Sequence, residues 1–438
     1  MTLGLPFITE PDPLVSGEGV LDPLGLSSIG DRLADQILPG LRARMWRVRF
    51  VTAIAVAASV CDGLEDEIAA DGVTPASIAF EWLLTEAFAR GGAPDLVRRT
   101  PGIDKARTAR QAGLHMSAKT YLKVPSVFGI HGVYKPLARH LGVVDDELRL
   151  SENGHALLDV WEREQGVSGF IARAAGGQNG GSLRTALRSA VVDALSKGYA
   201  DRSNGWQGWS FFLEHLLPSR IGSKEAELLE RLLRDLKGET RRELFDLVNA
   251  VADDADTSEL STVEQISPRA SAELTLRLAR IQAYERFCGQ VELGFGYLRW
   301  LSTQNRDQAI SPNAFASIPT VQRTAADLPA SKRAVERALE TAPAAIAAEF
   351  DRLGEYFQGC ATAQHLYQCL MRRHADVQKQ KPPDGKREWF EHAADEQIMV
   401  RIPYRLTTCP EPSAEWPRPY RLNTLRQFSV DLRRAIRG

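Results

Sequence analysis

The fold is decided by the stretch SAKTYLKV (117–124), FGIHGVYKPLARHLGVV (128–144), ELRL (147–150) and SENGHALLDVWERE (151–164). Leu148 and Leu150 alternate with Arg149, as the residues of a half-buried strand do. Ser151 is a typical N-cap for the helix that follows. A short helix, a brief strand and a capped helix follow one another in a winged helix, so the pattern predicts a winged-helix-like segment over 117–165. Pro136 either marks the first turn of the preceding helix or kinks a longer one.

The segment before this stretch is typical of a small helical domain. Residues 1–25 carry four prolines and four glycines, which disfavour both helix and sheet and predict an extended arm. Cap residues, prolines and glycines then predict helices over 27–38, 41–61 and 75–91. Together with the winged-helix-like segment, these helices are expected to form a domain over 26–175.

The segment after it is expected to be a second helical domain, over 182–373, separated by a linker in the run GGQNGG (176–181). Apolar spacing predicts helices over 182–199, 205–217, 224–236, 239–252, 268–303, 331–342 and 344–373. The helix over 268–303 carries an apolar stripe typical of a bundle core: Ile281, Tyr284, Cys288, Val291, Phe295 and Leu298. Residues 253–264 hold five acids and no base, which predicts a solvated loop.

Residues 374–438 differ from the rest, being basic and rich in proline. They are expected to form a mixed α/β basic tail with a strand over 398–406 and a final helix from Thr424. The fold class predicted for the whole chain is therefore mainly α: a helical domain with a winged helix, an α-helical bundle domain and this tail. Helix is expected to exceed strand by a wide margin.

Composition indicates an ordinary globular protein. The 438 residues are 44% hydrophobic and 25% charged, with a formal net charge of −2, so a nucleic-acid site would have to be local. The apolar run over Phe50–Cys61 is too short for a membrane span and predicts a buried helix. No basic, apolar signal segment opens the sequence, which favours a cytoplasmic protein without a membrane partner. Cys61, Cys288, Cys360, Cys369 and Cys409 lack metal-binding spacing and are expected to be free thiols.

Three common catalytic signatures are missing from the sequence. The glycine run lacks the Gly-Lys-Ser/Thr ending of a phosphate-binding loop, and neither G-x-S-x-G nor H-E-x-x-H occurs. We therefore expect no enzyme, no cofactor and no metal. One catalytic alternative stays open: a metal-dependent nuclease, for which carboxylates and a lysine are available in Asp376, Asp384, Lys386 and Glu388.

A basic run directly before and within the winged-helix-like segment is the main functional clue. Between residues 96 and 123 it has seven bases and one acid, Asp104, and the bases are Arg98, Arg99, Lys105, Arg107, Arg110, Lys119 and Lys123. These residues are expected to bind the phosphates of duplex DNA with weak sequence preference, while Lys135 and Arg139 would read bases. The acids Asp145, Asp146 and Glu147 would oppose phosphate at the turn. Two alternatives therefore remain: a winged helix that binds protein, and a plain surface charge run.

A second basic cluster follows the predicted bundle, close to Trp389. It consists of Arg372, Arg373, Lys379, Lys381, Lys386 and Arg387. A basic loop beside an aromatic ring could engage phosphates or single strands. The alternative is a solubilising loop that covers the end of a helix.

The sequence resembles an uncharacterised group of bacterial proteins associated with defence islands and mobile elements. The resemblance rests on DPLGL (22–26), on ILPGLRARMWRVRF (37–50) and on the block from YLKV to LSENGHALL (121–158). It implies a DNA-linked role beside other protein subunits. The function predicted is thus a non-catalytic DNA-binding subunit of an anti-phage or anti-plasmid defence assembly. The rival function is an interaction scaffold whose winged helix and 268–303 helix bind proteins only.

Overall fold

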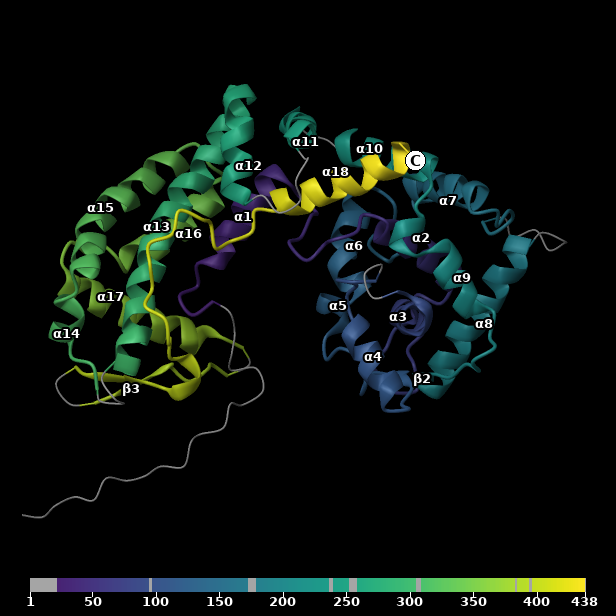
Figure 1. Cartoon of the computed structure of the whole chain (residues 1–438), viewed down its shortest axis with the longest axis horizontal. Coiled ribbons are helices and arrows are strands. Elements are labelled where there is room, and N and C mark those ends of the chain that lie inside the picture. The colour runs from purple at the N-terminus through teal and green to yellow at the C-terminus, as the bar shows by residue number, and fades with distance from the viewer. Residues whose placement is uncertain are drawn as a thin grey trace, which may run out of the picture. The chain divides into compact units, whose positions relative to one another are not determined.

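The computed structural model describes residues 22–93, 97–171, 179–235, 239–251, 258–304, 309–382, 384–393 and 396–437. Within these ranges the chain forms eighteen α-helices and two two-stranded sheets (Figure 1), which confirms the mainly α fold class. It divides into two compact units, each made of segments remote in sequence. The first unit takes the described residues up to Leu33 and Thr275–Arg418, and the second takes Ala34–Leu274 and the residues from Pro419 onward. The boundaries predicted near residues 175 and 373 fall inside the second and the first unit, respectively.

The second unit is built almost entirely of helices. They are α2 (Phe50–Cys61), α3 (Ala76–Gly91), α4 (Ile103–Gln111), α5 (Pro125–Phe128), α6 (Ile130–His140), α7 (Glu152–Glu164), α8 (Asn179–Lys197), α9 (Gly208–His215), α10 (Ser223–Asp235), α11 (Glu239–Val251), α12 (Glu259–Ile266) and α18 (Leu422–Arg437). Short 3-10 turns lie at Pro218–Arg220 and Ser267–Arg269. The strands β1 (Met116–Ser117) and β2 (Tyr199–Ala200) pair antiparallel, with Met116 opposite Ala200.

Helix α2 is the centre of the second unit. All twelve of its residues are buried, as expected for the apolar run, and α3, α6, α7 and α8 pack around it (Figure 1). The helix begins at Phe50 rather than near Leu41, because the preceding residues form turns in which Arg49 turns its side chain into the protein. Within the part of the chain that the structure describes, no helix combines the length and the apolar character that crossing a membrane would need.

A buried ion pair joins the start of α2 to α10. The guanidinium of Arg49 donates from Nε and Nη2 to the two carboxylate oxygens of Glu225, each at 3.2 Å, and both side chains are almost fully buried. Thr52 donates to the same carboxylate at 2.7 Å. Arg49 also donates to the carbonyl oxygens of His215, the last residue of α9, and of Leu217. This network fixes the chain where it enters α2.

The segment predicted as a winged helix contains three helices, α5, α6 and α7, and a tight turn joins α6 to α7. A strand was expected over 147–150, but this segment forms only one antiparallel bridge, between Val144 and Leu150. The strand prediction is therefore wrong. The Asp145 carboxylate accepts the backbone N–H groups of Glu147 and Arg149, which closes the turn before a strand can extend. Pro136 lies inside α6. The winged-helix assignment itself stays a prediction.

The acidic segment predicted as a solvated loop is partly helical. Residues 252–257 lie outside the described ranges, but Glu259 opens α12 and is buried. Its carboxylate accepts the backbone N–H groups of Tyr420 and Asn423 at 3.0 and 3.2 Å. Burial raises the pKa of Glu259 to about 7. The loop prediction is therefore wrong for 259–264, because this acid caps α18 instead of facing solvent.

The glycine run predicted as a linker falls partly outside the described ranges, and its last residues, Gly180 and Gly181, belong to α8. Helix α8 therefore begins at Asn179, three residues before the expected start.

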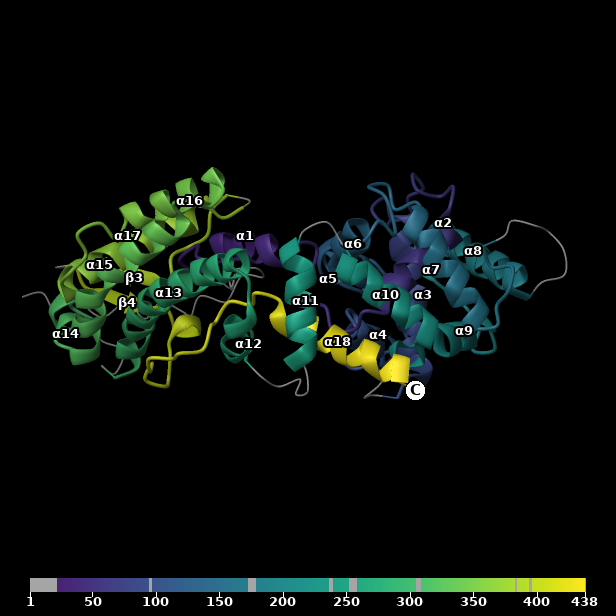
Figure 2. The same cartoon turned by 90° about the horizontal axis from the view of Figure 1, so that it is seen from above.

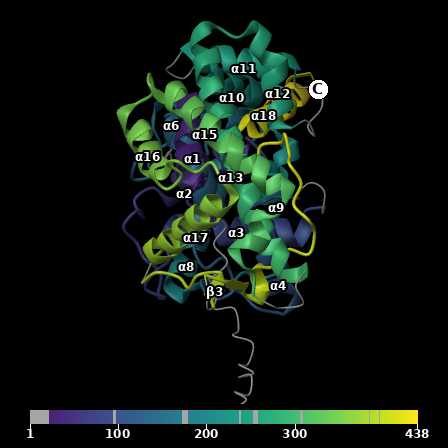
Figure 3. The ribbon, with the colours of Figure 1, turned by 90° about the vertical axis from the view of Figure 1, so that its left-hand side faces the viewer.

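The first unit is a helical bundle with a small sheet at one end (Figure 3). Its elements are α14 (Pro312–Ala316), α15 (Pro319–Leu339), α16 (Ala344–Glu355), α17 (Ala363–Gln380), β3 (Phe390–His392), β4 (Ile398–Val400) and a 3-10 turn at Ile402–Tyr404. Helices α1 (Ser27–Ile37) and α13 (Ala272–Gln304) have residues in both units. The apolar stripe predicted on the long helix is confirmed, since all six of its residues are buried.

Ring contacts show what this stripe packs against. Tyr284 meets Phe350 of α16 at 6.2 Å between ring centroids, and Phe295 meets His374 of α17 at 5.3 Å. In the tail, β4 covers only the first three residues of the strand expected over 398–406 and pairs antiparallel with β3, while Ile402–Tyr404 form a 3-10 turn. The single helix predicted over 344–373 is wrong, because turns over 356–362 separate α16 from α17.

Helix α18 completes the second unit although it stands at residues 422–437 of the sequence. It packs on α10, α11 and α12, as Figure 2 shows for the first two. Leu422, Leu425, Phe428 and Leu432 form its buried face. Asp431 pairs with Arg47 at 2.8 Å.

Replacing Phe428 by alanine is expected to lower the free energy of unfolding by about 4 kcal/mol, because it empties a fully buried site in this interface. Arg434→Ala on the exposed side of α18 is the matched control, with an expected change within about 0.5 kcal/mol. Urea denaturation followed by circular dichroism measures both. Equal effects of the two substitutions would show that α18 adds nothing to the core of the second unit.

Candidate nucleic-acid interface

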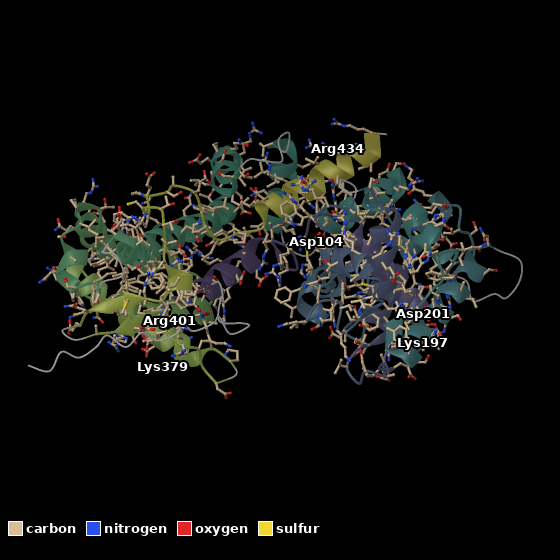
Figure 4. All side chains as sticks on the ribbon, turned by 60° about the horizontal axis from the view of Figure 1, so that its bottom comes forward. Asp104, Lys197, Asp201, Lys379, Arg401 and Arg434 are labelled. Atoms are coloured by element: carbon tan, nitrogen blue, oxygen red, sulfur yellow. The ribbon has the colours of Figure 1, made fainter. Side chains whose placement is uncertain are left out.

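Three arginines of the predicted basic run gather around one cavity of the second unit. Arg98, Arg99 and Arg107 line this cavity of about 480 Å³ together with a fourth arginine, Arg44. The other lining residues are Trp46, Thr100, Pro101, Ile103, Asp104, Phe128 and Val133. We call this cavity with its four arginines the arginine pocket. Asp104, labelled in Figure 4 at the start of α4, is the only acid among its lining residues.

Two of the four guanidinium groups are held against aromatic rings. The guanidinium carbon of Arg99 lies 3.6 Å from the ring centroid of Trp46, and that of Arg44 lies 4.6 Å from the ring centroid of Phe128. Such stacking uses the face of the guanidinium and leaves the N–H groups at its edge available. Within the ranges described, no carboxylate pairs with Arg44, Arg98 or Arg99, whereas Arg107 lies 3.6 Å from Asp104.

Arg99 has a backbone conformation that is unusual for a residue other than glycine. Its φ of 66° lies in the left-handed region, which residues other than glycine seldom adopt. Non-glycine residues in that region cost free energy and are found often at binding sites. This outlier therefore supports a functional role for Arg99.

Arg44 and Trp46 were not identified as site residues from the sequence. They lie about fifty residues before the basic run, in a segment positioned by α6. The hydroxyl oxygen of Tyr134 accepts the backbone N–H groups of Trp46 and Arg47 at 2.8 and 3.0 Å. Tyr134 is fully buried, so this anchor is rigid. The available signal was the run RARMWRVR (42–49), whose four arginines flank one tryptophan.

The remaining bases of the predicted run lie outside the arginine pocket. Arg110 donates to the carbonyl oxygens of Ala89 and Arg90, so it caps the C-terminal end of α3. Lys105 on α4 is exposed. Lys119 and Lys123 are exposed in the segment between β1 and α5. The structure thus gathers three of the seven predicted phosphate contacts in one place.

The two residues expected to read bases lie on another side of α6. Arg139 forms an ion pair with Asp146. Lys135 lines a separate cavity of about 320 Å³. Because Val133 lines the arginine pocket, α6 separates the two cavities.

This second cavity holds a buried carboxylate–imidazole pair at its wall. His131 lines the cavity, and its Nδ1 lies 3.0 Å from a carboxylate oxygen of Glu81 on α3. Glu81 also accepts the hydroxyl of Tyr121 at 2.5 Å and the backbone N–H groups of Ile130 and His131. Burial and this carboxylate raise the pKa of Tyr121 well above its usual value. The carboxylate therefore caps α6 and orients the imidazole.

The residues of the second basic cluster predicted from the sequence differ in their surroundings. Arg373 donates to the carbonyl oxygen of Leu24 at 2.7 Å, and Arg372 and Arg373 both lie over the ring of Tyr356. Lys379, labelled in Figure 4 at the end of α17, is exposed. Partial burial lowers the pKa of Lys381. The backbone N–H of Lys386 donates to the carbonyl oxygen of Gln378 in the turn after α17.

The four residues of the nuclease alternative also have separate surroundings. Asp376 on α17 accepts the hydroxyl of Tyr356 at 2.9 Å, and Glu388 lies 3.1 Å from the imidazole of His392. Asp384 is exposed. Over the described part of the chain, no group of three or more histidine, cysteine or acidic side chains is placed to hold a metal ion.

His374 gives the first unit a dependence on pH. It is fully buried, with Nδ1 3.0 Å from the carbonyl oxygen of Pro23 and Nε2 accepting the backbone N–H of Trp389 at 2.9 Å. A neutral imidazole satisfies both contacts, and a second ring proton would displace the Trp389 N–H. Burial lowers the pKa of His374 to about 4, from 6.5.

Acidification should therefore destabilise the first unit. Between pH 6.5 and 4 the unfolded histidine binds a proton that the folded one does not, so the stability from this group is complete above pH 6.5 and is lost as the pH falls. From about pH 7.5 to about pH 5 the free energy of unfolding should fall by roughly 2 kcal/mol on this account. Urea denaturation of the parent and of His374→Gln at both pH values measures it. An unchanged pH dependence in the variant would contradict the assignment.

Comparison of the sequence with family models and with curated proteins, and of the fold with solved structures, gives no match. The resemblance to defence-associated bacterial proteins stays a prediction.

Proposed function

We propose that the second unit binds duplex DNA through the arginine pocket and that the protein is a non-catalytic DNA-binding subunit. The observation that carries this proposal is the gathering of four arginines around one cavity with a single acid among its lining residues. Arginine presents a planar fork of N–H donors that matches the oxygens of a phosphate. Three of the four have no carboxylate partner among the described residues, so their charge is available to a ligand.

Binding of this kind should depend little on base sequence. Phosphate contacts release counterions and give affinity without sequence information. Lys135 lies away from the arginine pocket, and Arg139 is paired with Asp146, so neither supports base reading beside it. With about four phosphate contacts, affinity should fall roughly 10²-fold over a fourfold rise in salt.

The place of this protein in an anti-phage or anti-plasmid defence assembly is part of the proposal, and it is supported by the sequence resemblance alone. The rival function is an interaction scaffold that does not bind nucleic acid. A protein that fails to bind DNA would favour this function.

The double variant Arg44→Ala/Arg98→Ala tests the arginine pocket. We expect its affinity for a labelled random-sequence duplex to drop roughly 10-fold or more at low salt, and its salt slope to fall by about two, one for each lost contact. The matched control is Arg231→Ala/Arg333→Ala, which removes the same charge from two exposed arginines on α10 and α15. Fluorescence anisotropy at two salt concentrations measures both. Equal losses of DNA affinity in the two variants would mean that overall charge alone explains the effect. If the parent protein does not bind DNA, the result favours the interaction scaffold.

A single substitution separates binding from stability at Arg99. Arg99→Gly removes a guanidinium from the arginine pocket and relieves the left-handed backbone at the same time. The relief offsets the lost contact with Trp46, so the free energy of unfolding should stay within about 1 kcal/mol of the parent. DNA affinity should nevertheless fall. An affinity equal to that of the parent would remove Arg99 from the site.

A further inference from the structure

The arginine pocket places four arginines around one cavity, so their charge is concentrated in one place instead of being spread along a DNA backbone. Phosphodiesters along a duplex carry one charge each and lie on the convex surface of the helix. A terminal phosphate monoester carries about −1.5 to −2 near neutral pH and projects beyond the last base pair. Four arginines around an open cavity of about 480 Å³ can contact such a projecting group from several sides, and the cavity has room for part of the last nucleotide.

A patch of exposed apolar side chains adjoins the arginine pocket. Val124 directly precedes α5, and Val127 and Phe128 belong to it. Between 42% and 52% of each of these three residues is exposed, and Phe128 also lines the arginine pocket. Inside a duplex the apolar faces of the bases are covered by their neighbours. Only the terminal base pair offers a flat apolar face next to a phosphate.

Charge and apolar surface therefore match the same ligand. Phosphates along the side of a duplex would leave the α5 patch facing water. An apolar partner alone would leave Arg44, Arg98 and Arg99 unneutralised. The end of a duplex satisfies both features, since its phosphate and its last base pair lie side by side.

We propose that the arginine pocket and the α5 patch recognise the end of a DNA duplex that carries a 5′-phosphate. This inference rests on the proposed function and narrows it from duplex DNA to duplex ends. Arg44 and Arg98 bind the terminal phosphate, Arg99 binds it with the N–H groups of a guanidinium that lies against Trp46, and Phe128 contacts the last base pair.

Three duplex probes of one sequence test the proposal with the full-length protein: a blunt hairpin with a 5′-phosphate, the same hairpin with a 5′-hydroxyl, and a sealed dumbbell without ends. We expect the phosphorylated hairpin to bind roughly tenfold more tightly than the hydroxyl form, and the dumbbell to bind most weakly. Arg44→Ala/Arg98→Ala should abolish the preference for phosphate. Arg231→Ala/Arg333→Ala should keep it. Phe128→Ser should weaken both hairpins and leave the dumbbell unchanged.

The outcomes distinguish DNA binding in general from the recognition of duplex ends. Equal affinity for all three probes would overturn end recognition while leaving DNA binding in place. Binding to none of them would overturn the proposed function as well. A fourth probe is a single-stranded oligonucleotide with a 5′-phosphate. If it binds more tightly than the phosphorylated hairpin, the ligand is a single strand and not a duplex end.

Discussion

The second unit depends on the buried ion pair between Arg49 and Glu225. Both side chains are removed from water, where each charge alone would cost several kcal/mol, so each requires the other. Arg49 is the last residue before α2, and Glu225 lies in the first turn of α10. The pair thereby fixes the segment that carries Arg44 and Trp46. Losing one partner of such a pair typically costs about 3–5 kcal/mol, and Arg49 is five residues from Arg44, although neither charge of the pair lines the arginine pocket.

Elements whose signal is local could be predicted from the sequence. The apolar run of α2 and the stripe on α13 indicate buried helices, because the spacing of apolar residues is itself the physical cause of burial. Glu259 shows where this reasoning fails. Its acidic neighbours indicate solvent, but its carboxylate meets the backbone of Tyr420, 161 positions away, and the sequence contains no sign of that contact. The interleaved units escaped prediction for the same reason, since contiguous domains were assumed.

The candidate site was predicted in part, and the missing part has a physical explanation. Arg98, Arg99 and Arg107 stand in a run with little acid and were identified by charge alone. The segment over 42–49 has four arginines, and three of them have carboxylate partners: Arg42 pairs with nearby Asp35, whereas Arg47 and Arg49 pair with the remote Asp431 and Glu225. Only the fold shows that Arg44 is the one left for a ligand. Charge patterns indicate how many arginines are present, but not which of them are already neutralised.

The discontinuity of the second unit has a consequence for its biosynthesis. Residues 275–418 of the first unit are translated between α12 and α18, so the faces of α10 and α11 that α18 covers stay open meanwhile. At typical rates of translation this interval lasts roughly 7 to 30 s. During it the apolar faces are available to chaperones and to other nascent chains. A nascent chain that has not yet reached residue 422 therefore lacks the helix that covers these faces.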